Sequence, residues 1–183
     1  MDRETLTSDL ASQAELNWRV SDLRAVQYAS HSVSWVPVAS LISPPGSLAL
    51  HLGLSSQGRW LVVSPDGTVD DFEARQSYLH LFPLMEMSRA DVTEMLLAEF
   101  ATHRLNQAWI EYFPFEEILA AALKYDSKFW PDFALQWVPS FSRTAAIMEA
   151  LEVLNKQGRT QQQRHRAKRL LLEKCKELQT GIE

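Results

Sequence analysis

The fold is decided by the stretch from residue 48 to residue 72, which reads LALHLGLSSQGRWLVVSPDGTVDDF. Leucine occupies every second position from Leu48 to Leu54, and this period of two is typical of a strand. Pro65-Asp66-Gly67 indicates a turn, because proline presets φ and glycine accepts a positive φ. The pattern therefore predicts an antiparallel meander with strands at residues 48–54, 59–64 and 68–72 and turns at 55–58 and 65–67.

The residues before this meander predict one helix and one more strand. Apolar residues at three- and four-residue spacing predict a helix over residues 3–28. Residues 32–38 are rich in β-branched and aromatic side chains and predict a strand, which Pro37 places toward a sheet edge. Residues 25–58 contain no charged residue, but prolines and serines interrupt them. A membrane span needs about 20 predominantly apolar residues, so buried strands explain this stretch better.

After Pro83 the apolar period changes to that of helices. Ser88-Arg89-Ala90-Asp91 has the pattern of a capping box, and Gly158 lies where a helix C-terminus favours glycine. The expected helices cover residues 88–112, 115–125, 126–138, 142–156 and 160–178. The expected fold class is α+β, with an N-terminal helix and a small antiparallel β-meander packed against a predominantly helical C-terminal half. We expect one domain over residues 1–183, with subdomains at 1–83 and 88–183.

Composition indicates a soluble globular protein of the cytoplasm. The chain has 183 residues, of which 46% are hydrophobic and 22% charged. Its single cysteine, Cys175, excludes a disulfide framework within the chain and suits a reducing compartment. The first fifteen residues contain several charges and no apolar stretch of the kind found in signal peptides.

The net charge of −5 is unevenly distributed along the chain. Residues 156–183 carry eight Lys and Arg against three Glu, a net charge of +5, whereas the remaining ten Lys and Arg and twenty Asp and Glu leave −10. Phosphate contacts dominate nucleic-acid affinity, so only the C-terminal segment is suited to bind nucleic acid. Its cations are scattered around the helix and Arg169 has Glu173 at i+4, which favours a solvated helix over a nucleic-acid arm.

No catalytic, phosphate-binding or metal-binding sequence motif is present. The five histidines lie far apart in the sequence, and Cys175 shares a helical face with Leu171 and Leu178, where a cysteine acts as a small hydrophobe. We therefore expect no catalytic residue, no metal and no cofactor. An enzyme whose site is assembled from distant residues remains the alternative, and it would use His51, His80, His103 and carboxylates.

Aromatic residues are concentrated toward the C-terminal half. Ten of the 18 fall between residues 109 and 141, in a window that carries five Asp and Glu against two Lys. Most of the ten must be core, but one or two beside Trp130-Pro131 are candidates for surface anchors, because aromatic residues ringed by polar groups are typical of binding hot spots. The expected partner-binding residues are Glu111, Glu116, Glu117, Asp126, Trp130 and Asp132.

These features favour a non-enzymatic, acidic protein-binding module whose partner is another protein with a basic surface. Complementary charge would speed the encounter with such a partner. Immunity proteins against toxic enzymes and secretion chaperones have this general size and acidity, but no motif here matches either class. An inhibitor or immunity protein and an adaptor or chaperone are thus both compatible with the sequence, and nucleic-acid binding through residues 159–176 is a further alternative. The sequence leaves the oligomeric state open and predicts no membrane association.

Overall fold

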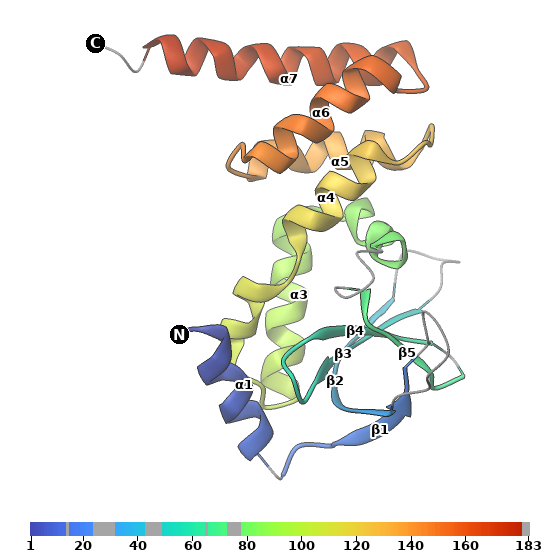
Figure 1. Cartoon of the computed structure of the whole chain (residues 1–183), viewed down its shortest axis with the longest axis vertical. Helices are drawn as coiled ribbons and strands as arrows, with labels where there is room; N and C mark the ends of the chain where they lie inside the picture. Colours follow the sequence, from blue (N-terminus) through green and yellow to red (C-terminus); the bar gives the residue numbers. More distant parts are fainter. Residues whose placement is uncertain (14, 24–31, 43–48, 65, 73–77, 181–183) are drawn as a thin grey trace. The chain divides into compact units, whose positions relative to one another are not determined.

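The computed structural model describes residues 1–13, 15–23, 32–42, 49–64, 66–72 and 78–180 (Figure 1). These residues form an antiparallel sheet preceded by a helix, followed by a mostly helical C-terminal half, which confirms the α+β class. The chain divides into two compact units. The first comprises Met1–Pro83 and Ala90–Phe113, and the second comprises Leu84–Arg89 and Pro114–Glu183.

The first unit contains a five-stranded antiparallel sheet whose strand order follows the sequence, β1-β2-β3-β4-β5. The strands are β1 (Arg19–Asp22), β2 (Ser32–Ile42), β3 (Ala49–Ser55), β4 (Trp60–Val63) and β5 (Val69–Asp70). The three strands expected between residues 48 and 72 are present as β3, β4 and β5, and each pairs with the next. The expected meander is thus confirmed and extended on its N-terminal side.

The sheet curls, and a bridge between Leu23 and Val69 connects the residue after β1 to β5. Residues Trp60, Leu61 and Val62 of β4 are buried, although they point to alternate faces of the strand. Leu61 packs with Trp35 and Val69 on one face. Trp60 lies on the other face, with its ring centroid 5.9 Å from that of Phe100. Within the long uncharged stretch of the sequence, residues 35–36 and 38–39 of β2 and 52–55 of β3 are buried.

Helices and 3-10 helices complete the first unit, namely α1 (Arg3–Ser12), α3 (Arg89–Thr102) and η2 (Gln107–Tyr112), while η1 (Leu79–Glu86) spans the boundary between the units. The side chain of Asp2 caps α1 by accepting a hydrogen bond from the amide of Thr5. The turn between β3 and β4 contacts α1 at Gly58, which has a φ of 71°. A Cβ there would lie 2.3 Å from the hydroxyl oxygen of Thr7, so the turn requires glycine for both reasons.

Three expectations for this unit are wrong. The helix expected over residues 3–28 ends at Ser12, because Arg19–Asp22 pair with β2 and tertiary pairing outweighs the helical spacing. Pro37 lies in an interior strand, where it is accommodated by a register shift next to it. The helix expected over residues 88–112 ends at Thr102, and Arg104, with a φ of 57°, separates it from η2.

The second unit consists of two helical hairpins. The first hairpin is α4 (Phe115–Lys124) with α5 (Trp130–Trp137), and the second is α6 (Ala145–Gln157) with α7 (Gln161–Thr180). A short 3-10 helix, η3 (Val138–Ser140), follows α5. Helix α4 packs against α6, and α5 packs against α7, so the two hairpins lie side by side. The side chain of Cys175 lies outside the residues whose side chains the structure describes, so its expected burial stays a prediction.

Residues Leu84–Arg89 belong to this helical unit through specific contacts. The indole of Trp137 donates a hydrogen bond of 2.8 Å to the carbonyl of Met87. The guanidinium of Arg89 lies over the rings of Phe115 and Phe141, and it donates to the carbonyl of Ser140. Within the described part of the chain, no helix combines the length and the apolar character that crossing a membrane requires.

Candidate functional site

The residues expected to form the partner surface lie in different units. Glu111 belongs to the first unit, and the others belong to the second. Glu116 and Glu117 occupy the first turn of α4, where negative charge is favoured by the helix dipole. Asp126 lies in the loop between α4 and α5, and Trp130 and Asp132 lie in the first turn of α5. All of the expected residues except Glu111 thus lie in the first hairpin of the second unit.

The two glutamates of α4 have different environments. Glu116 is partly buried and accepts a hydrogen bond of 2.5 Å from the hydroxyl of Thr144. Thr144 is the N-cap of α6 and accepts a bond from the amide of Ile147. Glu116 therefore connects α4 to the start of α6. Glu117 is exposed and is the one of the two that is suited to meet a partner.

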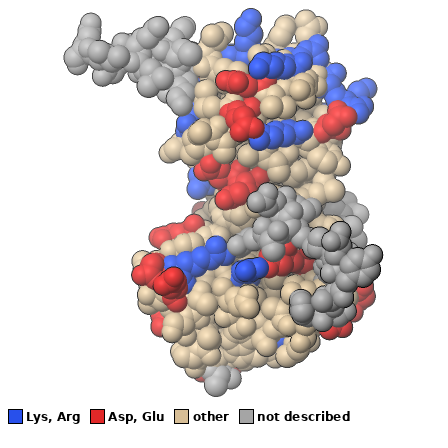
Figure 2. Space-filling model, viewed as in Figure 1, with Lys and Arg blue, Asp and Glu red and all other residues tan. Residues whose placement is uncertain are grey.

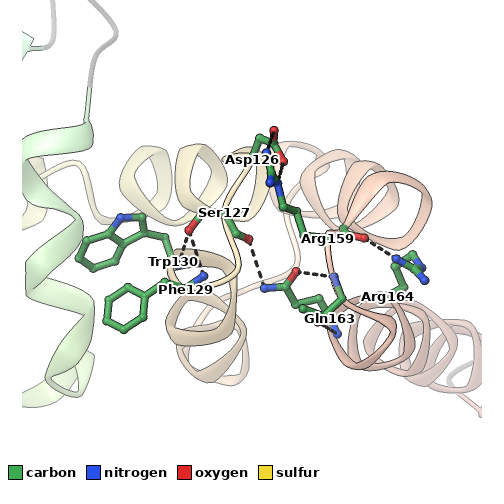
Figure 3. Close-up of polar contacts among 9 residues, drawn as sticks. Asp126, Ser127, Phe129, Trp130, Arg159, Gln163 and Arg164 are labelled. Carbon is green, nitrogen blue, oxygen red and sulfur yellow. Dashed lines mark hydrogen bonds and ion pairs between the residues drawn. The ribbon is translucent and has the colours of Figure 1, made fainter.

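Asp126 forms a bidentate ion pair with Arg159, from the turn between α6 and α7 (Figure 3). The Arg159 Nε–Asp126 Oδ1 distance is 2.5 Å, and the Nη2–Oδ2 distance is 2.6 Å. Hydrogen bonds from Arg159, assisted by its positive charge, lower the pKa of Asp126 below its ordinary value of 3.8. The pair is solvent-accessible, because the Asp126 side chain is 73% exposed and that of Arg159 49%.

Asp132 also faces a cation of the second hairpin. Its Oδ1 atom lies 4.0 Å from Nη1 of Arg166. Around α6 and α7, Figure 2 shows basic and acidic side chains interspersed on the visible face. Two acidic residues of the first hairpin, Asp126 and Asp132, thus each face a basic residue of the second. The neighbouring cations therefore offset the negative charge that the sequence predicts for this surface at Asp126 and Asp132.

The loop between α4 and α5 presents aromatic side chains to solvent. We call residues 125–129 the anchor loop. Phe129 is 50% exposed and Tyr125 is 42% exposed, whereas Trp130 is half-buried. The ring of Phe129 makes edge-to-face contacts with Trp130 and with Phe133, both at centroid distances of 4.8 Å. Sequence reasoning chose Trp130 and missed Phe129, although Phe129 directly precedes the Trp130-Pro131 joint.

Hydrogen bonds fix the backbone of the anchor loop. The hydroxyl of Ser127 accepts bonds from the amides of Phe129, at 2.9 Å, and Trp130, at 3.4 Å. The side chain of Gln163, which is fully buried, donates a bond of 3.3 Å to the carbonyl of Ser127 (Figure 3). The backbone that carries the exposed aromatic rings is therefore held in place by specific hydrogen bonds.

Gln163 is positioned by the start of α7. Its side-chain oxygen accepts a bond from the amide of Thr160, and the hydroxyl of Thr160 accepts one from the amide of Gln163. This reciprocal arrangement is a capping box. Sequence reasoning missed Gln163, and the signal that could have found it was the spacing of Thr160 and Gln163 directly before an apolar-periodic helix.

A small pocket lies between the anchor loop and the residues that join α6 to α7. Its volume is about 70 Å³, and its lining includes Tyr125, Asp126, Ser127, Gln157, Gly158 and Arg159. A single water needs roughly 10–15 Å³ of such volume, so the pocket has room for a few waters or one small side chain. It is too small to hold a substrate-sized ligand, for which sites of about 300–1,000 Å³ are usual.

The histidines named for the enzymatic alternative all lie in the first unit. Nδ1 of His51 lies 2.9 Å from the hydroxyl of Ser40 across the β2–β3 pairing, and Nε2 of His103 lies 3.7 Å from Glu99 on α3. His80 is exposed on η1. In the described residues, no group of three or more His, Cys, Asp or Glu side chains is arranged to hold a metal ion.

Comparison with known proteins adds no further constraint. No protein-family model, curated protein or solved structure matches this chain.

Proposed function

We propose that this protein is a non-enzymatic protein-binding module of the cytoplasm and that the anchor loop of the second unit docks its partner. The observation that carries the proposal is Phe129, a large aromatic side chain that is half exposed while its own amide is hydrogen-bonded to Ser127. An inhibitor and an adaptor are both roles that such a surface can serve.

Fixing the loop backbone favours binding for a general reason. Ordering a side chain or loop at an interface costs about 0.5–1.5 kcal/mol for each immobilised group. A loop that is ordered before the encounter avoids part of this cost. Phe129 and Tyr125 also offer apolar area beside polar groups, which is the composition of binding hot spots.

The charge of the partner follows from the residues that stay available for steering. The first hairpin, residues 114–141, carries four Asp and Glu against two Lys, and Glu117 is exposed next to the partly buried Glu116. A partner with a basic surface would be attracted at long range, and its approach would be slowed by salt. Glu117 is the residue to reverse in a test, since reversing Glu116 would also disturb the cap of α6.

The proposal is tested by isolating the partner from the native host and measuring its binding kinetics with two variants. Phe129→Ala is expected to speed dissociation by about 30-fold, which corresponds to roughly 2 kcal/mol for the loss of a central aromatic residue. Glu117→Lys is expected to slow association at low salt and to have little effect on dissociation.

Leu172→Ala is a matched control, because Leu172 is also a large apolar residue that is about half exposed in the same unit. It is expected to leave both rate constants unchanged. If Phe129→Ala dissociates at the wild-type rate from a partner that the wild-type protein binds, the anchor loop is not the docking site.

A further inference from the structure

We infer that the turn of the second hairpin, together with the first turn of α7, acts as a latch on the anchor loop. Arg159 and Gln163 hold residues 125–129 at two points, Asp126 and the carbonyl of Ser127, and so set the conformation in which Phe129 is presented. The role in presenting Phe129 to a partner rests on the proposed function, whereas the latch itself is a property of the loop and is testable without a partner. We call the two contacts the Arg159 link and the Gln163 link.

The two links differ in their chemistry. The Arg159 link is a bidentate ion pair to the side chain of Asp126, open to solvent. The Gln163 link joins a fully buried amide to the backbone carbonyl of Ser127. Solvent ions screen exposed charges strongly and buried dipoles hardly at all, so the Arg159 link weakens with salt and the Gln163 link does not.

The side of the latch on the second hairpin is itself well constrained. Arg164 folds back and donates a hydrogen bond of 2.5 Å to the carbonyl of Gly158. A Cβ at Gly158 would lie 2.6 Å from the carbonyl oxygen of Leu154, so the chain approaches itself closely at the end of α6. Thr160 and Gln163 cap α7 reciprocally. Arg159 and Gln163 therefore extend from a fixed turn toward a loop that has no helix of its own.

The hydrogen bonds within the anchor loop join residues that are two or three positions apart in the sequence. The amide of Ser127 bonds to the carbonyl of Tyr125, and Ser127 in turn accepts from Phe129 and Trp130. Irregular segments with few buried contacts open at low free-energy cost, and additional partners raise that cost. The latch thus regulates how often the anchor loop departs from the conformation that presents Phe129.

Amide hydrogen exchange of residues 125–130 in the full chain tests the latch directly. Arg159→Ala is the deciding variant, since it removes the ion pair and leaves the capping box of α7 in place. We expect about fivefold faster exchange of the Ser127, Phe129 and Trp130 amides, as the loss of a strong exposed pair implies. Asp126→Ala should have the same effect, and the double variant should exchange no faster than either single one.

Salt separates the two links. In the wild-type protein, exchange in the loop should rise as salt increases from about 0.05 to 0.5 M, because screening weakens the ion pair. In Arg159→Ala it should be independent of salt. Arg169→Ala is the control, because the pair of Arg169 with Glu173 lies within α7, and exchange in the anchor loop should match the wild type.

Unchanged exchange of residues 125–130 in Arg159→Ala at low salt would overturn the latch. Salt-dependent exchange that persists in Arg159→Ala would overturn the Arg159 link as its source. The binding kinetics of Phe129→Ala test the docking role separately, so the latch and the proposed function can fail independently.

Discussion

A carboxylate on the surface of a protein can be strongly constrained by one partner, and Asp126 is such a residue. Both of its oxygens accept hydrogen bonds from Arg159. These bonds and the guanidinium charge lower the pKa of Asp126 from its ordinary value of 3.8. The same contact raises the pKa of Arg159 above its ordinary value. Each residue is thus held in its charged form by the other.

We expect Asp126 in the folded protein to titrate below 3.8 and to return toward that value in Arg159→Ala. A group whose pKa is lowered by folding stabilises the folded state above its unfolded pKa, and this stabilisation is lost as the pH falls through the folded pKa. The pair should therefore contribute fully at neutral pH. NMR titration of the Asp126 carboxyl carbon measures the shift, and Arg169→Ala should leave that titration unchanged. An identical titration in wild type and Arg159→Ala would show that the pair is absent in solution.

At the scale of elements, Thr144 connects the two hairpins of the second unit. It caps α6 and donates a hydrogen bond to Glu116 of α4. We expect Thr144→Ala to lower the free energy of unfolding by about 1 kcal/mol, since a lost N-cap costs this amount. Thr144→Ser, which keeps the hydroxyl, should be close to wild type. Urea unfolding of the full chain measures both variants.

Thr102 provides the matched control for this prediction. Its hydroxyl donates to the carbonyl of Ala98 within the same helix and caps no N-terminus. Thr102→Ala should therefore shift the urea midpoint less than Thr144→Ala does. Equal shifts for the two alanine variants would argue against the capping role of Thr144.

The elements differ in how well their sequence patterns predict them. Alternating leucines and the Pro65-Asp66-Gly67 turn predict β3 to β5, because the local pattern and the sheet agree there. Leu16, Val20 and Leu23 have helical spacing, but β1 forms at Arg19–Asp22 because β2 lies beside it. Arg104 ends a helical region in the left-handed conformation, which a non-glycine residue rarely adopts and which no local pattern announced.

The candidate site was predictable only in part, for a similar reason. The aromatic cluster and its acidic residues are visible in the sequence, and most of them do lie on the second unit. Which of Phe129 and Trp130 faces solvent depends on how the loop enters α5. The pairing of Asp126 with Arg159 depends on the stacking of two hairpins. A single sequence carries no direct signal for the exposure of one aromatic residue over its neighbour, or for an ion pair between two hairpins.

At the scale of the whole molecule, the charge distribution bears on whether the partner is a protein or a nucleic acid. The described cations Arg159, Arg166 and Arg169 each face a carboxylate of the chain itself. Pairing to these carboxylates competes with pairing to phosphates, and the whole chain is acidic. We therefore expect fluorescence anisotropy with a single-stranded oligonucleotide to show no affinity tighter than about 100 μM at roughly 0.15 M salt. Low-micromolar binding that weakens steeply with salt would favour the nucleic-acid alternative instead.

The curled sheet of the first unit has a consequence for how the chain reaches its structure. Every strand pairs with its neighbour in sequence, so each pairing closes a short loop and loses little chain entropy. The bridge between Leu23 and Val69 is different, because it joins opposite ends of the meander. We therefore expect the sheet to assemble hairpin by hairpin, with the contact between Leu23 and Val69 as its slowest pairing.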